Sequence, residues 1–469
     1  MEAFAGFAEH TDHEVGRYVH ALEELDALDD TVFLYILGDN GASGEGGVHG
    51  CFNEIAGLNG VHDSTEHILS KLDEIGGPTA YNHYPAAWAH AMDAPYQWTK
   101  QVASHWGGTR VGMVAHWPNG IGDAGQVRDQ WQHVIDVFPT ILELAGLPNP
   151  RTVNGVTQQR VDGTSFADNL RGADAPERVV TQYFEMFGNR GIYHDGWSAC
   201  TKHVTPWDLT YIPPLTDDTW ELYAPDDWSQ AHDLAAEMPE KLAELQQLFL
   251  VEAERNHVLP LDDRRSERFN PAVAGRPDLL GGRTSVRLFP GMTRLATSAV
   301  PNIKNKSHQI TASITVPDTA TGVILAQGSR FSGWSLHVVD GRRAYTYNYL
   351  GAEIYDVVAT TALTPGQHVV RFDFAIDDGP EFGKGGTATL TVDDATVGEA
   401  RIAKTVPFHY MGSTDVGCDI GSGVVLSGYA TPRGAFTGDI EWVEMAIDDG
   451  SGSHTTPAKV ALDIEVSMQ

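Results

Sequence analysis

The chain has 469 residues, with 63 acidic and 31 basic side chains, and its formal net charge is −32 at pH 7. This length exceeds what one compact domain usually holds, so two or three domains are expected. So acidic a surface repels phosphate backbones, which argues against a nucleic-acid partner, and no run of about 18 apolar residues predicts a membrane span.

The amino-terminal region is predicted to alternate between helices and strands. Residues 1–29 place apolar side chains at three- and four-residue steps, which predicts an amphipathic helix. The apolar, β-branched run at 31–37 predicts a strand buried on both faces, as in a parallel sheet. A similar strand is predicted at 111–117 and a helix at 239–256. Residues 1–260 therefore predict an α/β domain.

The carboxy-terminal region has a different pattern. Residues 261–284 lose apolar periodicity and gain proline, glycine and charge, which predicts a linker. Residues 285–469 contain short segments of period-two alternation separated by Gly, Asp and Pro, which predicts an all-β sandwich domain. The first residues show neither the basic nor the apolar region of a signal peptide, so a cytoplasmic location is the default expectation.

Asp39 and Asn40 are the strongest local candidates for chemistry. They directly follow the predicted strand at 31–37, at the edge where open α/β sheets bind ligands. A carboxylate beside an amide carbonyl offers the hard oxygen ligands that Ca²⁺ or Mg²⁺ prefers. An Asx-Gly turn explains the same residues equally well.

Lys100 begins a second candidate segment, in which QVASHWGGTR follows the lysine. Its ammonium, near a Gly-Gly pair and Arg110, would suit a bound oxyanion, and His105 would be able to donate to the same anion. The simpler interpretations are a solvated lysine and a packing histidine.

Six strings along the chain carry a family resemblance. They are TVFLYILGDNGASGEGG, KQVASHWGGTRVGMVAHWP, HVIDVFPTILELAGLP, VDGTSF, IYHDGWSAC and WELYAPDDWSQAHDLAAEMPEKLAELQ, within residues 1–260. In this order and spacing they resemble the arylsulfatases, which are sulfatases of the alkaline phosphatase superfamily. The β-rich remainder resembles the accessory carboxy-terminal domain of large bacterial arylsulfatases.

The resemblance implies metal-assisted hydrolysis of a sulfate ester, either a small molecule or a sulfated glycan. A divalent cation, usually Ca²⁺, would polarise the sulfate, and a formylglycine made from a Cys or Ser in C/S-x-P-x-R would attack the sulfur. It assigns Asp39 and Asn40 as metal ligands and Lys100 as the lysine that holds a sulfate oxygen. The spacing from Lys100 to Gly-Gly is one residue longer than the resemblance implies, so His105 stays a candidate.

The motif that supplies the nucleophile is missing from the sequence. The nearest string runs from Asp174 to Arg178, with Asp where Cys or Ser should stand. The family's amino-terminal aspartate ligands are also missing. We therefore expect an α/β domain that is incomplete at its amino terminus, and a chain that is inactive alone.

Two other functions stay open. The chain would act as a glycan- or partner-binding module if aromatic residues of the β-rich domain, among them Trp334, Tyr345, Tyr347 and Tyr349, formed a platform, although alternating aromatics in strands are usually core. Phosphodiesterases and phosphonate hydrolases of the same superfamily are the other alternative.

Overall fold

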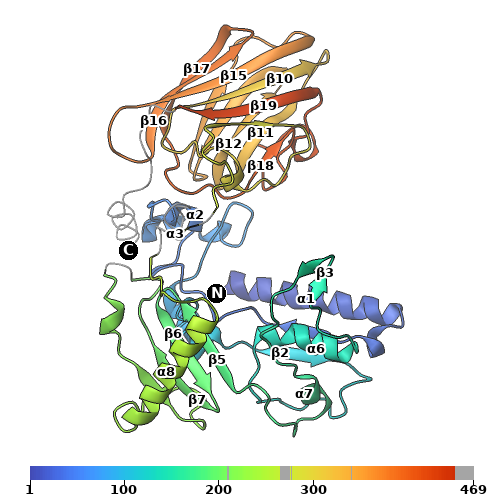
Figure 1. Ribbon diagram of the computed structural model, residues 1–469. Coiled ribbons are helices and arrows are strands. Elements are labelled where there is room, and N and C mark those ends of the chain that lie inside the picture. Colours follow the sequence, from blue (N-terminus) through green and yellow to red (C-terminus); the bar gives the residue numbers. More distant parts are fainter. Residues whose placement is uncertain (209–210, 265–274, 276, 340, 449–469) are drawn as a thin grey trace. The chain divides into compact units, whose positions relative to one another are not determined.

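The computed structural model describes residues 1–208, 211–264, 275, 277–339 and 341–448 (Figure 1). They form two compact units. The first unit contains residues 1–50 and 84–264, and the second contains residues 51–83 together with the described residues that follow Arg264. No helix among the described residues is both long and apolar enough to cross a membrane.

The first unit mixes helices with small sheets. Its helices are α1 (Glu2–Glu24), α4 (Ala86–Asp93), α5 (Trp106–Thr109), α6 (Val137–Leu144), α7 (Ala167–Arg171) and α8 (Pro239–Arg255). Its strands are β1 (Phe33–Ile36), β2 (Met113–His116), β3 (Thr152–Val153), β4 (Val156–Thr157), β5 (Thr181–Met186), β6 (Asn189–His194), β7 (Trp197–Thr201) and β8 (Glu221–Tyr223). The predicted helices at both ends of this region and the two predicted strands are confirmed.

The predicted parallel sheet was wrong. Strand β1 pairs antiparallel with β2, with Phe33 opposite His116, and all four residues of β1 are only half-buried. Every strand pair described in this unit is antiparallel. The apolar run at 31–37 has the composition of a strand covered on both faces, but composition does not reveal how many neighbours a strand has.

Strands β5 to β8 form an antiparallel sheet in chain order, and α8 packs against it. Asp195 and Gly196, which both have positive φ, form the tight turn that joins β6 to β7. Apolar residues from β6, β7, β8 and one face of α8 share a core, which includes Ile192, Ala199, Leu222, Leu245 and Phe249.

The second unit is built from two antiparallel sheets. One has the order β17-β16-β15-β10-β19-β9 and the other β14-β13-β12-β11-β18. The bounds are β9 (Ser285–Leu288), β10 (His308–Val316), β11 (Gly322–Ser329), β12 (Ser332–Val339), β13 (Arg342–Tyr349), β14 (Glu353–Val358), β15 (Gly366–Ile376), β16 (Lys384–Val392), β17 (Ala395–Lys404), β18 (Ser413–Val416) and β19 (Asp439–Ile447). Residues of both sheets share one hydrophobic core, in which Tyr345 of β13 stacks on Phe372 of β15 at 3.6 Å.

The aromatic residues that were candidates for a binding platform lie in this core. Trp334, Tyr345 and Tyr347 are at most 3% exposed, and Tyr349 is half-buried against the same cluster. They alternate along β12 and β13 because their side chains point inward. The platform interpretation of these residues was therefore wrong.

Residues 51–83 belong to the second unit, although the prediction placed them within a first domain of residues 1–260. The segment contains α2 (Glu54–Gly57) and α3 (Thr65–Ser70). Ile55 and Ala56 are buried in the core of the β-rich unit, and Asn53 donates to the carbonyl of Leu350 at 2.8 Å. The predicted boundary near residue 260 is close to the second break between units, at Arg264.

Candidate functional site

The loop after β1 presents Asp39 and Asn40, as the sequence predicted. Asp39 is exposed and Asn40 is half-buried. The Asn40 side chain donates through its Nδ2 to the carbonyl of Gly41 at 3.1 Å. Its Oδ1 takes no part in that bond. Among the residues that the structure describes, none hydrogen-bonds to the Asp39 carboxylate. Both oxygen donors are thus available to a ligand.

Close packing against α5 holds this loop in place. Gly41 donates to the carbonyl of Gly108 at 3.1 Å. A Cβ atom on Gly41 would lie 1.7 Å from the carbonyl oxygen of Gly107. Only glycine permits so close a backbone approach, so Gly41 and the Gly107-Gly108 pair act together to fix the position of the loop.

Asp93, at the end of α4, was not predicted from the sequence. Its Oδ1 accepts from the backbone N–H of Ala42 at 2.8 Å, whereas its buried Oδ2 has no hydrogen-bond partner in the described structure. Burial raises the pKa of Asp93 to about 6. Because buried carboxylate oxygens normally have partners, this unpartnered Oδ2, on a carboxylate that contacts the backbone of Ala42, leaves one acceptor next to the loop unsatisfied.

Lys100 is brought to the same loop. Its backbone N–H donates to the carbonyl of Ala42 at 3.0 Å, and its Nζ lies 2.6 Å from Oε2 of Glu45. Ser43 donates to the same oxygen at 2.9 Å, and Gln101 donates to the other. Burial opposes ionisation of Glu45, but these hydrogen bonds prevail and lower its pKa.

The backbone on both sides of Lys100 is strained. Trp98 has a φ of 67° and Gln101 a φ of 74°, and bulky residues rarely adopt this conformation. The ammonium of Lys202 lies 5.0 Å from the centre of the Trp98 ring. Strain of this kind collects at functional sites, where the surrounding structure maintains it.

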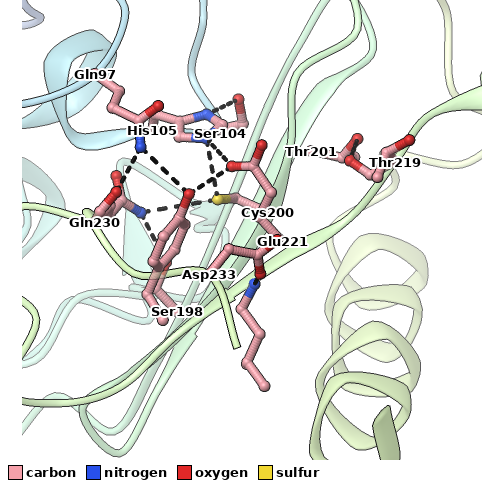
Figure 2. Close-up of polar contacts among 12 residues, drawn as sticks. Gln97, Ser104, His105, Ser198, Cys200, Thr201, Thr219, Glu221, Gln230 and Asp233 are labelled. Carbon is pink, nitrogen blue, oxygen red and sulfur yellow. Dashed lines mark hydrogen bonds and ion pairs between the residues drawn. The ribbon is translucent and has the colours of Figure 1, made fainter. Parts of the chain in front are cut away.

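His105 lies in a separate buried network, which Figure 2 shows. Its ring is fully buried, with Nδ1 2.8 Å from the Ser104 hydroxyl and Nε2 2.8 Å from Oε2 of Glu221. Tyr223 donates to the same carboxylate oxygen at 2.6 Å. With both ring nitrogens engaged inside the protein, His105 would have to give up one of these contacts to donate to a bound sulfate, and its role as a substrate-binding residue stays a prediction.

The same network brings together three groups of the kinds that bind metal ions. Ligand atoms of His105, Cys200 and Glu221 lie within 4.8 Å of one another. However, burial raises the pKa of the Cys200 thiol well above its ordinary value, and the thiolate is the form that binds metals. Gln230 donates to Sγ of Cys200 at 3.8 Å and accepts from the Trp106 N–H at 2.8 Å, which connects this network to the start of α5.

The sequence comparisons converge on one family. Residues 1–147 match the model of the sulfatase family. An uncharacterized sulfatase of Schizosaccharomyces pombe is 29% identical over 280 residues, which cover 58% of this chain and 47% of that protein. Human arylsulfatase D is 27% identical over 207 residues, which cover 44% of this chain and 27% of that protein. The chain thus matches about half or less of the length of these relatives.

Among solved structures, mouse laminin alpha1 chain, domains LG4-5, is similar over 36% of this chain and 40% of that chain. The sequence identity is 16% and the TM-score is 0.22, which is too low to support an argument about fold or function.

Proposed function

Since this chain is a sulfatase-family protein, we propose that its first unit carries the metal- and sulfate-binding part of a sulfuric ester hydrolase site. The observation that supports this proposal is the meeting of two distant segments at Ala42. That residue follows Asp39, Asn40 and Gly41 directly, and its carbonyl accepts from the N–H of Lys100. Two segments that are distant in sequence, one with the oxygen ligands of Asp39 and Asn40 and one with Lys100, are thereby joined through their backbones.

Asp39 and Asn40 would hold a divalent cation, and their hard oxygen donors favour Ca²⁺. When bound, such a cation polarises a sulfate oxygen as a Lewis acid. Lys100 would donate to a sulfate oxygen once a substrate anion replaces Glu45 as its partner. Asp93 would keep the loop in its binding conformation through its bond to the N–H of Ala42.

We propose that this chain does not hydrolyse sulfate esters alone, because the sequence contains no C/S-x-P-x-R motif. For the second unit, we propose that its two sheets form the predicted sandwich. A shared core and the stack of Tyr345 on Phe372 support that arrangement.

Isothermal titration of the full chain with CaCl₂ tests the metal ligands. We expect weak binding, with a Kd on the order of 10⁻⁴ to 10⁻³ M, because few protein ligands are present. Asp39→Asn should abolish the binding heat. Asp12→Asn changes a similarly exposed aspartate on α1 and should leave it unchanged. Equal binding by both variants would refute the assignment, and turnover of 4-nitrophenyl sulfate by the pure chain would refute the proposed inactivity.

A further inference from the structure

The outer face of the six-stranded sheet carries a row of polar side chains. Pairing in register across five neighbouring strands aligns Thr391 of β16, Arg371 of β15, Thr311 of β10, Glu444 of β19 and Arg287 of β9. Neighbouring strands are about 4.8 Å apart. The row therefore places two hydroxyl and three charged groups at nearly regular intervals across the sheet.

This face is the one that does not contact the core. Side chains alternate between the two faces of a strand, and the residues on either side of Thr311 and of Arg371 are buried among the apolar core. A groove of about 230 Å³ runs along the polar face. It is lined by the polar row without Arg287, and by Gln309, Val369, Asp394 and Trp442. It is unrelated to the loop that holds Asp39 and Asn40, since it lies wholly within the second unit.

Arg371 is held in place by one hydrogen bond and still has free donors at its terminal nitrogens. Its Nε donates to Oδ2 of Asp373 at 2.8 Å, and Gln309 donates to Oδ1 of the same carboxylate at 2.7 Å. In the described part of the chain, the two terminal nitrogens of Arg371 have no partner, and its side chain is 41% exposed. A planar guanidinium held at one edge and open at the other matches the paired oxygens of a sulfate or carboxylate.

Trp442 adds an ordered aromatic surface to the groove. The guanidinium of Arg287 lies 4.3 Å from the centre of its ring, and the same guanidinium contacts Glu444 at 3.1 Å. The ring is half-buried. The groove therefore offers an apolar surface beside hydroxyl, amide and charged groups. These suit a sugar ring, whose C–H groups pack against apolar surfaces and whose O–H groups form hydrogen bonds.

We propose that this groove binds an anionic saccharide. The free edge of Arg371 takes a sulfate or carboxylate group, Trp442 packs against a sugar ring, and Thr311 and Gln309 hydrogen-bond to hydroxyls. The group that selects an anion is the free edge of Arg371. Arg287 is held by Glu444 and the Trp442 ring and does not line the groove, whereas the carboxylates of Glu444 and Asp394 do. An extended peptide would add to an unpaired strand edge, whereas this groove crosses paired strands.

Titration calorimetry on the full chain tests the proposal with three hexasaccharides: chondroitin 4-sulfate, chemically desulfated chondroitin, and neutral maltohexaose. We expect the first to bind and maltohexaose not to bind. Equal binding of desulfated chondroitin identifies the carboxylate as the group recognised, and its loss identifies the sulfate. Failure of both chondroitins to bind, or equal binding by maltohexaose, would overturn the proposal.

Two variants that should change the affinity in opposite directions test whether the ligand binds in this groove. Arg371→Gln should weaken binding on the order of tenfold, as loss of a charge-assisted bidentate contact does. Glu444→Gln should strengthen it, because a carboxylate that repels the ligand is removed. Arg401→Gln is the matched control, since Arg401 also pairs with a carboxylate, that of Asp377, but does not line the groove. Equal weakening by Arg371→Gln and Arg401→Gln, or none by Arg371→Gln at an unchanged Tm, would refute the assignment.

Discussion

At the scale of single residues, the ion pair of Lys100 and Glu45 bears most directly on the proposed sulfate site. Their side chains are 32% and 26% exposed, and the ion pair is 2.6 Å long. In the proposed site, a sulfate would therefore compete with Glu45 for the ammonium of Lys100. Partial burial makes this pair stronger than a fully solvated one, in which side-chain entropy and water offset most of the attraction.

A double-mutant cycle with Lys100→Met and Glu45→Gln measures this pair. We expect a coupling free energy of about 1 kcal/mol in urea unfolding, because either single change removes the charge-assisted contact between two half-buried side chains. The pair Lys241–Glu244 on α8, 2.9 Å long with Glu244 58% exposed, should couple by only about 0.3 kcal/mol. Equal coupling in the two cycles would contradict the expected effect of burial.

His308 should make the second unit sensitive to acid. Burial lowers its pKa from about 6.5 to about 4. Because the folded pKa lies below the unfolded one, the contribution of His308 to stability is fully present above pH 6.5. It is lost as the pH falls toward 4, and amounts to about 3 kcal/mol at most.

His308→Asn tests this pH dependence, because asparagine can still donate to the carbonyl of Lys306, which lies 2.9 Å from Nδ1 of the histidine. Urea midpoints at pH 7 and pH 4.5, followed by tryptophan fluorescence, should differ less in the variant than in the unaltered chain. His10→Asn, at an exposed position on α1, serves as the control. An undiminished acid sensitivity in His308→Asn would show that other groups cause it.

Sequence reasoning found the residues whose type alone suggests chemistry. Asp39, Asn40 and Lys100 stand out because they combine a suitable functional group with a strand end or a glycine pair. Asp93 and Glu45 gain importance only from their partners, the N–H of Ala42 and the ammonium of Lys100. Glu45 does lie within the glycine-rich run after Asn40, and that position was the only hint of its role.

At the scale of elements, the absence of side chains on Gly41, Gly107 and Gly108 lets the loop after β1 pack directly against α5. Gly41→Ala should lower the stability of the first unit by about 2 kcal/mol or more, because its Cβ would overlap the carbonyl of Gly107. Gly16→Ala on α1 meets no atom within 4 Å and should stabilise the helix by up to about 1 kcal/mol. Differential scanning calorimetry should show a lower Tm only for Gly41→Ala.

Element types were easier to predict than their pairing. Periodicity located α8 and the strands of the second unit, because each of these elements buries one face against a core. The neighbours of β1 could not be predicted in this way. A fully apolar run indicates burial, whereas the direction of its partner depends on chain connections far away in sequence.

At the scale of the whole molecule, residues 51–83 belong to the β-rich unit, although they lie within the amino-terminal region of the sequence. Asn59 accepts from the N–H groups of Phe408 and His409 and donates to the carbonyl of His409. The side chain of Ile55 is 4% exposed. A domain boundary predicted from composition could not place residues 51–83 in the β-rich unit, because this segment lacks the period-two pattern of that unit's strands.

A fragment of residues 285–448 should therefore be less stable alone than with a peptide of residues 51–83. We expect the peptide to raise the Tm of the fragment, because it fills the surface that Ile55 and Ala56 cover. A peptide with Ile55→Ala should raise it less, since loss of a buried Ile side chain costs about 2 to 4 kcal/mol. A Tm that neither peptide changes would contradict the assignment of this segment to the second unit.

The most direct test of the central claim is diffraction from crystals of the full chain soaked in CaCl₂ and Na₂SO₄, with anomalous data that locate the cation. We predict a cation bound by the oxygens of Asp39 and Asn40, and a sulfate within hydrogen-bonding distance of Nζ of Lys100. A loop that remains without a cation, or a cation bound by His105, Cys200 and Glu221 instead, would contradict it.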